Sequence, residues 1–210
     1  MTKLFLASEM KHPDSIKKLK TYIGESLKEK NIVYIPTAAN GEFYGSWKGG
    51  ESIKVARSLC SNLNIIELEN FSIIDIYSPL KKADIIWMAG GMSGYLLYWM
   101  RRTGLNKQLP EIINHGTHYI GSSAGSMICA KTQLSAEWLI GDCETGASLI
   151  PGLGLIDFEI YPHYEDELLP QINILWKGNE LYLLKNGEVI IVEDNEIRVL
   201  GEKRILHGRN

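Results

Sequence analysis

Residues 121–125 of this chain, Gly-Ser-Ser-Ala-Gly, place Ser123 in the pattern G-x-S-x-G. An apolar run precedes the pattern and a run of small residues follows it, as in a nucleophile elbow, where a strand turns sharply into a helix. Because glycine has no side chain to crowd such a turn, the Ser123 hydroxyl would stand clear at the carboxyl end of the strand. The predicted chemistry is attack of Ser123 Oγ on a carbonyl carbon. The alternative is a tight strand–helix turn without chemistry.

A serine hydroxyl is a poor nucleophile unless a base takes its proton. Of the five histidines, His163 is the best candidate for this base, because it directly follows an apolar run and is predicted at the carboxyl end of a strand. His115 precedes the strand that leads to the serine, at the opposite end of the sheet, and His118 lies inside that strand. His12 and His207 lie near the two ends of the chain.

A third group should hold the imidazole through its other nitrogen. Three acidic residues between the serine and the histidine are candidates, namely Glu137, Asp142 and Glu144. Asp157 and Glu159 lie within the run that precedes the histidine. The residue pattern by itself leaves the choice among these acids open.

A tetrahedral intermediate carries a negative oxygen, which needs preorganised N–H donors. The N–H of Ala124, directly after the serine, is one candidate. Gly90 and Gly91 follow another apolar run, so they are predicted at the end of a neighbouring strand, where glycine allows a close backbone approach. The alternatives for this glycine pair are a plain turn and a phosphate-binding loop.

Apolar periodicity places these residues on an alternating series of strands and helices. Such alternation predicts βαβ units, with a mostly parallel sheet covered by helices on both faces. Ligands bind such sheets outside the carboxyl ends of the strands, where the glycine pair and the serine would both lie. Strands are expected at residues 3–7, 31–36, 65–68, 83–88 and 117–121, helices at 13–29, 52–63, 95–102 and 110–114, and a short element at 73–77.

The pattern changes near the end of the chain. A strand is expected at residues 155–161, and three short apolar runs follow at 181–184, 188–192 and 196–200. Turn-forming residues separate these three runs, which predicts an antiparallel β-meander. The predicted fold class is therefore α/β with an antiparallel C-terminal tail.

The composition narrows the function classes. The length of 210 residues predicts one domain spanning residues 1–210. A net charge of −3 argues against a nucleic-acid footprint, and no apolar run reaches the ~18 residues that span a bilayer. We therefore expect a cytoplasmic protein whose partners include neither nucleic acid nor membrane. The three cysteines are far apart, and their spacing predicts neither a disulfide framework nor a metal site.

Taken in order, these segments resemble the dipeptidase E family of serine peptidases, which also contains the cyanophycinases. The resemblance covers most of the chain and is carried by residues 34–38, 89–91, 121–125, 152–158 and 162–164. It implies a three-layer sandwich of the class I glutamine amidotransferase type, which is flavodoxin-like. It also implies a reaction that needs no metal and no organic cofactor.

The resemblance assigns roles to individual residues. It makes Ser123 the nucleophile and His163 the base. It makes the N–H groups of Gly91 and Ala124 the oxyanion hole.

The third residue of the family's triad is an acid between the serine and the histidine. Asp142 is preferred for this role, and Glu137 is the alternative. The family usually has Gly-Gly-Asn at the glycine loop, whereas Met92 follows the two glycines here. Gly90 and Met92 are expected beside the substrate, where the amide of the family's asparagine is missing, and a peptidase of altered specificity is an alternative.

The expected function is hydrolysis of small peptides, including peptides with an N-terminal Asp, through a Ser-His-Asp/Glu triad and an acyl-enzyme. An N-terminal Asp would need a cation, for which Arg101, Arg102 and Lys48 are candidates. The alternatives are another hydrolase, such as an esterase, and a binding protein on an inactive scaffold. A monomer or a homodimer is expected.

Three aromatic residues lie in the loop after the second predicted strand: Phe43, Tyr44 and Trp47. They are predicted to line or cover the site. The alternative is that they only pack this loop against the body of the protein.

Overall fold

A seven-stranded sheet forms the centre of the protein, in the order β3-β2-β4-β5-β1-β8-β9. The computed structural model describes residues 2–42, 47–139, 141, 143–194 and 196–208. The strands of this sheet are β1 (Lys3–Ala7), β2 (Asn31–Ile35), β3 (Asn62–Ile65), β4 (Ile85–Met88), β5 (His118–Ser122), β8 (Val189–Glu193) and β9 (Glu196–Leu200). Strands β1 to β5 are parallel, and the β8–β9 hairpin joins the sheet antiparallel to β1.

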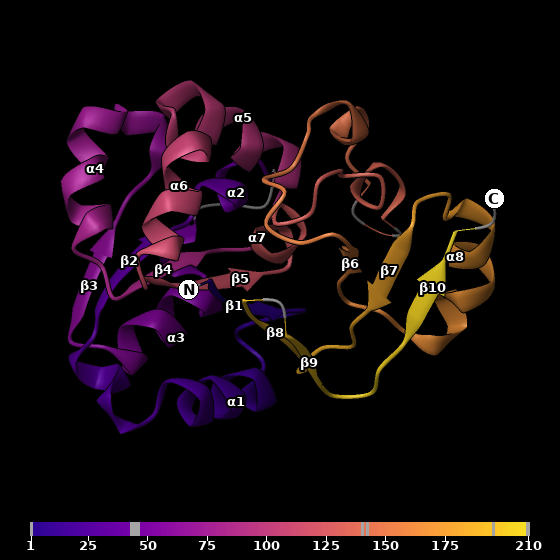
Figure 1. Ribbon diagram of the computed structural model, residues 1–210, viewed down its shortest axis with the longest axis horizontal. Helices are drawn as coiled ribbons and strands as arrows, with labels where there is room; N and C mark the ends of the chain where they lie inside the picture. The colour runs from indigo at the N-terminus through magenta and orange to yellow at the C-terminus, as the bar shows by residue number, and fades with distance from the viewer. Residues whose placement is uncertain (1, 43–46, 140, 142, 195, 209–210) are drawn as a thin grey trace.

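Helices cover both faces of this sheet (Figure 1). They are α1 (Pro13–Ile23), α2 (Thr37–Asn40), α3 (Glu51–Leu59), α4 (Ile73–Lys81), α5 (Ser93–Thr103), α6 (Leu105–Asn114), α7 (Ala124–Met127) and α8 (Leu169–Leu175). Helices α1 and α3 lie on one face, and α4, α5 and α6 lie on the other (Figure 1). The α8 helix belongs to a smaller C-terminal layer.

The sheet separates two apolar cores, as alternating side chains along a strand require. On β1, Leu4 and Leu6 pack with the core under α4 to α6, whereas Phe5 and Ala7 pack with the core under α1 and α3. All four side chains are fully buried, because β1 lies inside the sheet with helices on both sides. The predicted α/β sandwich with a mostly parallel sheet is confirmed.

A second, three-stranded sheet lies beside the first and has the order β10-β7-β6. Its strands are β6 (Glu159–Tyr161), β7 (Glu180–Leu183) and β10 (Ile205–His207). Strands β6 and β7 run parallel, and β10 is antiparallel to β7. Side chains from α8 and from this sheet form a third apolar core, which includes Ile172, Trp176 and Leu181.

Strands β7, β8 and β9 form close to where the sequence predicts them, whereas the strand expected at residues 155–161 is confined to Glu159–Tyr161, and β10 was not predicted. The predicted single meander is wrong. Strand β7 pairs with β6 and β10 in the small sheet, whereas β8 and β9 form a hairpin on the large sheet. The turn at residues 184–188 therefore carries the chain from one sheet to the other.

Several local predictions need correction. The strand expected at residues 65–68 is β3, which ends at Ile65, and the helix expected at residues 52–63 is α3, which ends at Leu59. The predicted helix at residues 13–29 is interrupted at Gly24, whose φ of 85° is not helical, and a 3₁₀ helix follows (Glu25–Glu29). The element predicted at residues 73–77 is the α4 helix, which Ser72 and Asp75 start with a capping box and which continues past Pro79. None of the described helices combines the length and the apolar character that a membrane span requires.

Candidate active site

The serine pattern forms a strained turn between β5 and α7. Ser123 has φ 48° and ψ −113°, a conformation that residues other than glycine seldom adopt. A Cβ atom at Gly121 would lie 2.6 Å from the Gly125 carbonyl oxygen, and one at Gly125 would lie 2.4 Å from the Met88 carbonyl oxygen. Both glycines of the pattern are therefore required by close backbone contacts.

Strand β1 anchors this turn from the side. The Ala7 carbonyl oxygen accepts hydrogen bonds from the Ser123 N–H (3.1 Å) and from Ser126 Oγ (2.8 Å). From within β5, the Tyr119 hydroxyl donates to the Gly125 carbonyl oxygen at 2.5 Å. Burial raises the pKa of Tyr119 well above its ordinary value, so this hydroxyl keeps the proton that it donates.

His163 and Ser123 come from different sheets and lie in contact. His163 follows β6 of the small sheet, and its Nε2 lies 3.0 Å from Ser123 Oγ. This distance is within the range that proton transfer to a general base requires. His163 also has a positive φ, 54°, so both members of the pair sit in strained backbone.

The other ring nitrogen of His163 faces an amide. His163 Nδ1 lies 2.7 Å from Asn186 Oδ1, in the turn between β7 and β8. Buried Ser8, directly after β1, accepts a hydrogen bond from the His163 N–H (2.8 Å) and donates to Asn186 Oδ1 (3.3 Å). Because Asn186 Oδ1 is then the acceptor, His163 Nδ1 carries the hydrogen and Nε2 presents its lone pair to Ser123.

Two backbone N–H groups are candidates for binding an oxyanion. Ala124 begins α7, and Gly91 lies in the loop between β4 and α5. In the part of the chain that the structure describes, neither N–H has a hydrogen-bond partner. Gly91 has φ 132°, and a Cβ atom there would lie 2.3 Å from the Ala38 carbonyl carbon, so only glycine fits.

The neighbouring loop residues fix the position of Gly91. The Met92 N–H donates to the Ala38 carbonyl oxygen at 3.0 Å, which ties the loop to the start of α2. A Cβ atom at Gly90 would lie 3.2 Å from Ser123 Cβ, so Gly90 packs directly against the serine. The glycine loop and the serine turn thus meet at the carboxyl ends of β4 and β5.

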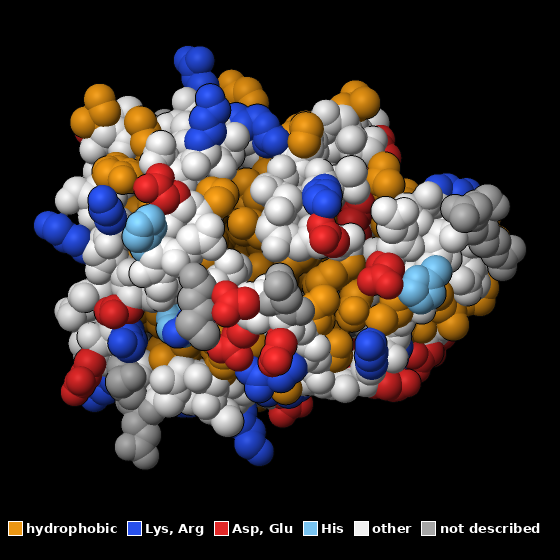
Figure 2. All heavy atoms as spheres, in the orientation of Figure 1, with side chains coloured by type: hydrophobic (Ala, Val, Ile, Leu, Met, Phe, Trp, Pro, Cys, Tyr) orange, Lys and Arg blue, Asp and Glu red, His pale blue; other side chains and the backbone are white. Residues whose placement is uncertain are grey.

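A cavity of about 540 Å³ opens over these residues. Its size is within the usual range for small-molecule sites, about 300–1,000 Å³. The carboxylates that line it belong to Glu9, Glu42, Glu51 and Glu144, and Lys11 and His163 line it as well. Its larger apolar side chains come from Trp47, Met92, Met127 and Leu139. On the face seen in Figure 2, hydrophobic side chains gather in the hollow between the two sheets.

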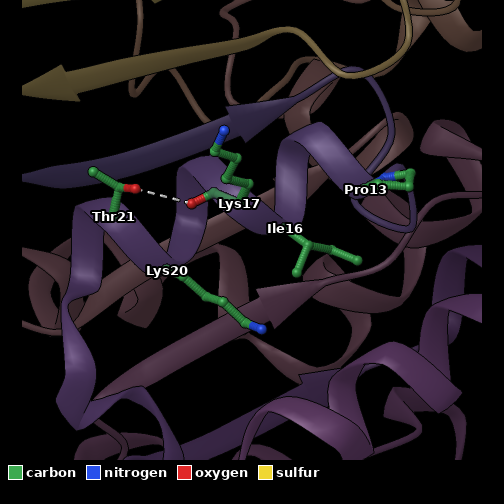
Figure 3. Close-up of a pocket in the computed structure, with 5 residues that line it drawn as sticks. All are labelled: Pro13, Ile16, Lys17, Lys20 and Thr21. Carbon is green, nitrogen blue, oxygen red and sulfur yellow. Dashed lines mark hydrogen bonds between the residues drawn. The ribbon is translucent and has the colours of Figure 1, made fainter.

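Another hollow of about 410 Å³ lies along the outer side of α1 (Figure 3). Beside it, the Thr21 hydroxyl donates a hydrogen bond to the Lys17 carbonyl oxygen. Its lining is Pro13, Ile16, Lys17, Lys20 and Thr21. These side chains provide no nucleophile paired with a base. The Ser123 cavity is therefore the candidate catalytic site.

The model of Peptidase family S51 matches residues 4–200 of the chain. The chain belongs to this family. It is 30% identical over 207 residues to an uncharacterized peptidase of Listeria monocytogenes, a match that covers 94% of this chain and 97% of that protein. It is 28% identical over 201 residues to Peptidase E of a Nostoc species, covering 89% of this chain and 78% of that protein.

Solved structures agree with this S51 assignment. A crystal structure described as that of a Peptidase E protein from Listeria monocytogenes matches with a TM-score of 0.81 and 27% identity, covering 95% of this chain and 98% of that chain. A peptidase from an acI-B1 Actinobacterium shares the fold, with a TM-score of 0.67 and 19% identity over all of this chain and 96% of that chain. The predicted dipeptidase E family and its enzyme class, a serine-type peptidase, are confirmed.

Glu137, one of the two acids expected to complete the triad, has other hydrogen-bond partners. The Glu137 carboxylate accepts hydrogen bonds from the Gly146 N–H (2.8 Å) and from the N–H and hydroxyl of Ser148 (3.0 and 2.8 Å). These bonds hold the pKa of Glu137 below its ordinary value and occupy both of its oxygens. Asp142 lies outside the residues that the structure describes.

The remaining candidate acids are engaged as well. Glu144 accepts hydrogen bonds from the N–H groups of Ser93 (2.5 Å) and Gly94 (2.7 Å), at the start of α5. Asp157 pairs with Lys131, and Glu159 binds the segment around Ser135. None of the described candidates is a hydrogen-bond partner of His163.

Sequence reasoning missed Asn186 and Ser8. Asn186 lies in the sequence Lys-Asn-Gly, which predicts a hairpin turn. The turn alone accounts for an asparagine at this position, so the sequence gives no sign that its side chain has another role. A parallel pairing of β6 with β7 would have indicated the contact, because the carboxyl ends of parallel neighbours lie at the same edge of a sheet. The predicted meander paired β7 with β8 instead and so separated Asn186 from His163.

The predicted substrate contacts are placed as follows. Gly90, Met92 and Trp47 line the cavity, and the Trp47 indole N–H also donates to Glu67 Oε2 at 3.1 Å. Phe43 and Tyr44 lie outside the described residues.

The three cations predicted to bind an N-terminal Asp are not among the residues that line the cavity. Arg101 donates to the carbonyl oxygens of Leu97 and Pro151. Lys48 Nζ lies 4.0 Å from the Glu67 carboxylate, and Arg102 is exposed near the end of α5. Among the described residues, Lys11 is the lysine that lines the cavity.

Proposed function

We propose that this S51 peptidase hydrolyses peptide bonds in small peptides by transferring the acyl group to Ser123. The observation that carries the proposal is the 3.0 Å contact between His163 Nε2 and Ser123 Oγ at the floor of the cavity. A cavity of about 540 Å³ accommodates a few residues of peptide, not a folded chain.

In the first step, His163 Nε2 takes the hydroxyl proton while Ser123 Oγ bonds to the carbonyl carbon of the substrate. The carbonyl π electrons move onto oxygen, and the N–H groups of Gly91 and Ala124 stabilise the resulting oxyanion. Asn186 holds the ring through Nδ1, so Nε2 stays directed at the serine during the transfer.

In the second step, the protonated His163 gives its proton to the leaving amine, and the carbon–nitrogen bond breaks. The acyl group stays on Ser123 as an ester. Water then attacks this ester with His163 again as the base, which releases the carboxylic acid product and restores the serine.

A preference for an N-terminal Asp is part of this proposal. Its carboxylate would need a cation in the cavity, and Lys11 is the described lysine there. Lys11 Nζ already lies 3.0 Å from the Glu9 carboxylate.

The proposal is tested with a phosphonate probe for activated serines and a dipeptide library, applied to wild type and to Ser123→Ala. One adduct by intact mass and release of amino acids are expected for wild type, and neither for Ser123→Ala. Labelling without peptide cleavage, together with cleavage of esters, would favour another hydrolase. Neither labelling nor turnover would favour a binding protein.

A further inference from the structure

The α5 helix begins directly after the glycine loop and is capped by a side chain from a distant part of the sequence. The N–H groups of Ser93 and Gly94, its first two residues, donate to the two carboxylate oxygens of Glu144 at 2.5 and 2.7 Å. Glu144 lies 50 residues further along the chain than Gly94. A Cβ atom at Gly94 would lie 3.2 Å from Glu144 Oε2, so the carboxylate rests directly on this backbone.

The residues at the start of α5 do not cap the helix themselves. Met92 occupies the N-cap position with extended backbone, φ −85° and ψ 119°, but its side chain makes no capping hydrogen bond. The buried hydroxyl of Ser93 has no hydrogen-bond partner in the part of the chain that the structure describes. Because the first N–H groups of a helix have no partner within the helix, a buried helix start needs an acceptor from elsewhere. The Glu144 carboxylate is this acceptor for two of them.

The backbone of Glu144 is fixed in turn to the core of the small sheet. Its N–H donates to the Ala136 carbonyl oxygen, and its carbonyl oxygen accepts from the Ala147 N–H, both at 2.9 Å. Ala136 and Ala147 are buried in the third apolar core. In the last turn of α5, Arg101 donates to the Pro151 carbonyl oxygen. The segment from Glu144 to Pro151 is therefore bonded to both ends of α5.

The cap by Glu144 bears on the candidate oxyanion hole. Gly91 lies two residues before Ser93, and the N–H of Met92 between them donates to the Ala38 carbonyl oxygen. The three N–H groups that follow Gly91 are thus all held by the protein, whereas the Gly91 N–H has no partner among the described residues. A donor that is fixed before the reaction stabilises an oxyanion without having to reorganise.

We propose that Glu144 is a positioning residue for the oxyanion hole, because its carboxylate fixes the start of α5 and thereby the direction of the Gly91 N–H. This inference rests on the proposed peptidase function and adds a residue to it. The position and the charge of Glu144 predict opposite effects. As a negative charge that lines the cavity, Glu144 would oppose an oxyanion, so the loss of its charge alone would raise kcat. The loss of its cap would lower kcat.

Glu144→Gln tests this with a dipeptide that the wild type cleaves, at a temperature below the unfolding range of each variant. The amide keeps the shape of the side chain, but it offers one acceptor oxygen in place of two, and its NH₂ group would face an N–H donor. We expect kcat to fall about tenfold, a smaller loss than removal of a donor causes, because the oxyanion forms only after attack. The KM should stay within about twofold of the wild-type value, as for an interaction made in the transition state.

Asp75→Asn is the matched control for the loss of a helix cap. Asp75 belongs to the capping box of α4, on the same face of the sheet, and is not among the described residues that line the cavity. This variant should leave kcat and KM unchanged.

Met92→Asn supplies the missing cap locally, because asparagine is a preferred N-cap residue and the backbone at this position already has N-cap geometry. In this background, Glu144→Gln should lower kcat by a smaller factor than in the wild-type background. An unchanged or raised kcat in Glu144→Gln, a loss confined to KM, or an equal loss in the Met92→Asn background would overturn the inference and leave the peptidase function standing. Cleavage of no dipeptide by the wild type would overturn both.

Discussion

At the scale of single residues, the notable group is an amide where an acid was predicted. Asn186 accepts from His163 Nδ1, as the asparagine of Cys-His-Asn peptidases does. An amide orients the ring, but unlike a carboxylate it carries no charge to stabilise the imidazolium. The pair Ser123 and His163 was predictable because each directly follows an apolar run at a strand end. Asn186 was not, because its local sequence is that of an ordinary turn.

Asn186→Asp tests this difference. The new carboxylate would stabilise protonated His163, so the acidic limb of the pH–kcat profile should move to higher pH. Asn186→Ala should instead lower kcat by up to about 100-fold, since the ring loses its orientation. Asn62→Asp, at an exposed position on β3, is the matched control for added charge. An unchanged profile in Asn186→Asp would count against the role of Asn186.

The buried hydroxyl of Ser8 is a second test at this scale. It links the His163 backbone to the Asn186 amide, so Ser8→Ala should lower kcat more than it raises KM. Steady-state kinetics on a cleaved dipeptide measure this split. A change confined to KM would show that Ser8 acts on substrate binding and not on the histidine.

At the scale of elements, strand ends and loops decide the geometry. The central strands β1, β2, β4 and β5 were predictable, because buried parallel strands appear as short apolar runs. The pairing of β7 was not, because it depends on contacts with β6 and β10, which the local pattern does not record. The glycine loop was predicted to lie at the ligand side, but its contact with α2 comes from the tertiary structure alone.

Gly91→Ala is expected to lower kcat by about 10²–10³-fold, the usual effect of removing one oxyanion donor. Its Cβ atom would lie 2.3 Å from the Ala38 carbonyl carbon, so the loop must move. Gly49→Ala is the control, because a Cβ atom there meets nothing within 4 Å. Equal kcat values for the two variants would remove Gly91 from the proposed oxyanion hole.

The loop of residues 144–150 has a pH-dependent anchor. The pKa of Glu137 is lower in the folded protein than its ordinary value, because its ionised form accepts hydrogen bonds from Gly146 and Ser148. Its contribution to stability is present above the ordinary glutamate range and is lost as the pH falls through the folded-state pKa. The Tm of Glu137→Gln should therefore lie below that of wild type at pH 7, and the two should converge in acid. A Tm difference that stays constant with pH would contradict this.

At the scale of the whole molecule, the candidate site lies where two sheets meet. Ser123 directly follows β5 of the large sheet, and His163 lies two residues after β6 of the small one. The packing of the small sheet on α8 is therefore expected to matter for catalysis, although no residue of α8 lines the cavity. The family was predictable from the order of the motifs, because that order follows the strand ends around the site.

Ile172→Ala tests this dependence. Ile172 is fully buried in the core of the small sheet, and removing a buried aliphatic side chain of this size costs about 2–5 kcal/mol. The expected result is a lower free energy of unfolding together with a lower kcat below the unfolding range. Ile174→Ala, on the same helix but 71% exposed, should change neither. Full kcat in a destabilised Ile172→Ala would show that the small sheet holds His163 independently of this core.

The division of the site between the two sheets also has a consequence for synthesis. Ser123 is synthesised first, His163 follows 40 residues later, and Asn186, which holds the His163 ring, follows 23 residues after His163. Strand β8, which closes the large sheet against β1, comes only after this amide. On the proposed mechanism, an unfinished chain would hold Ser123 without its base, and hydrolysis would require that the segment carrying His163 and Asn186 has emerged and folded. The order of these residues along the chain would therefore keep the nascent protein inactive until this segment has folded.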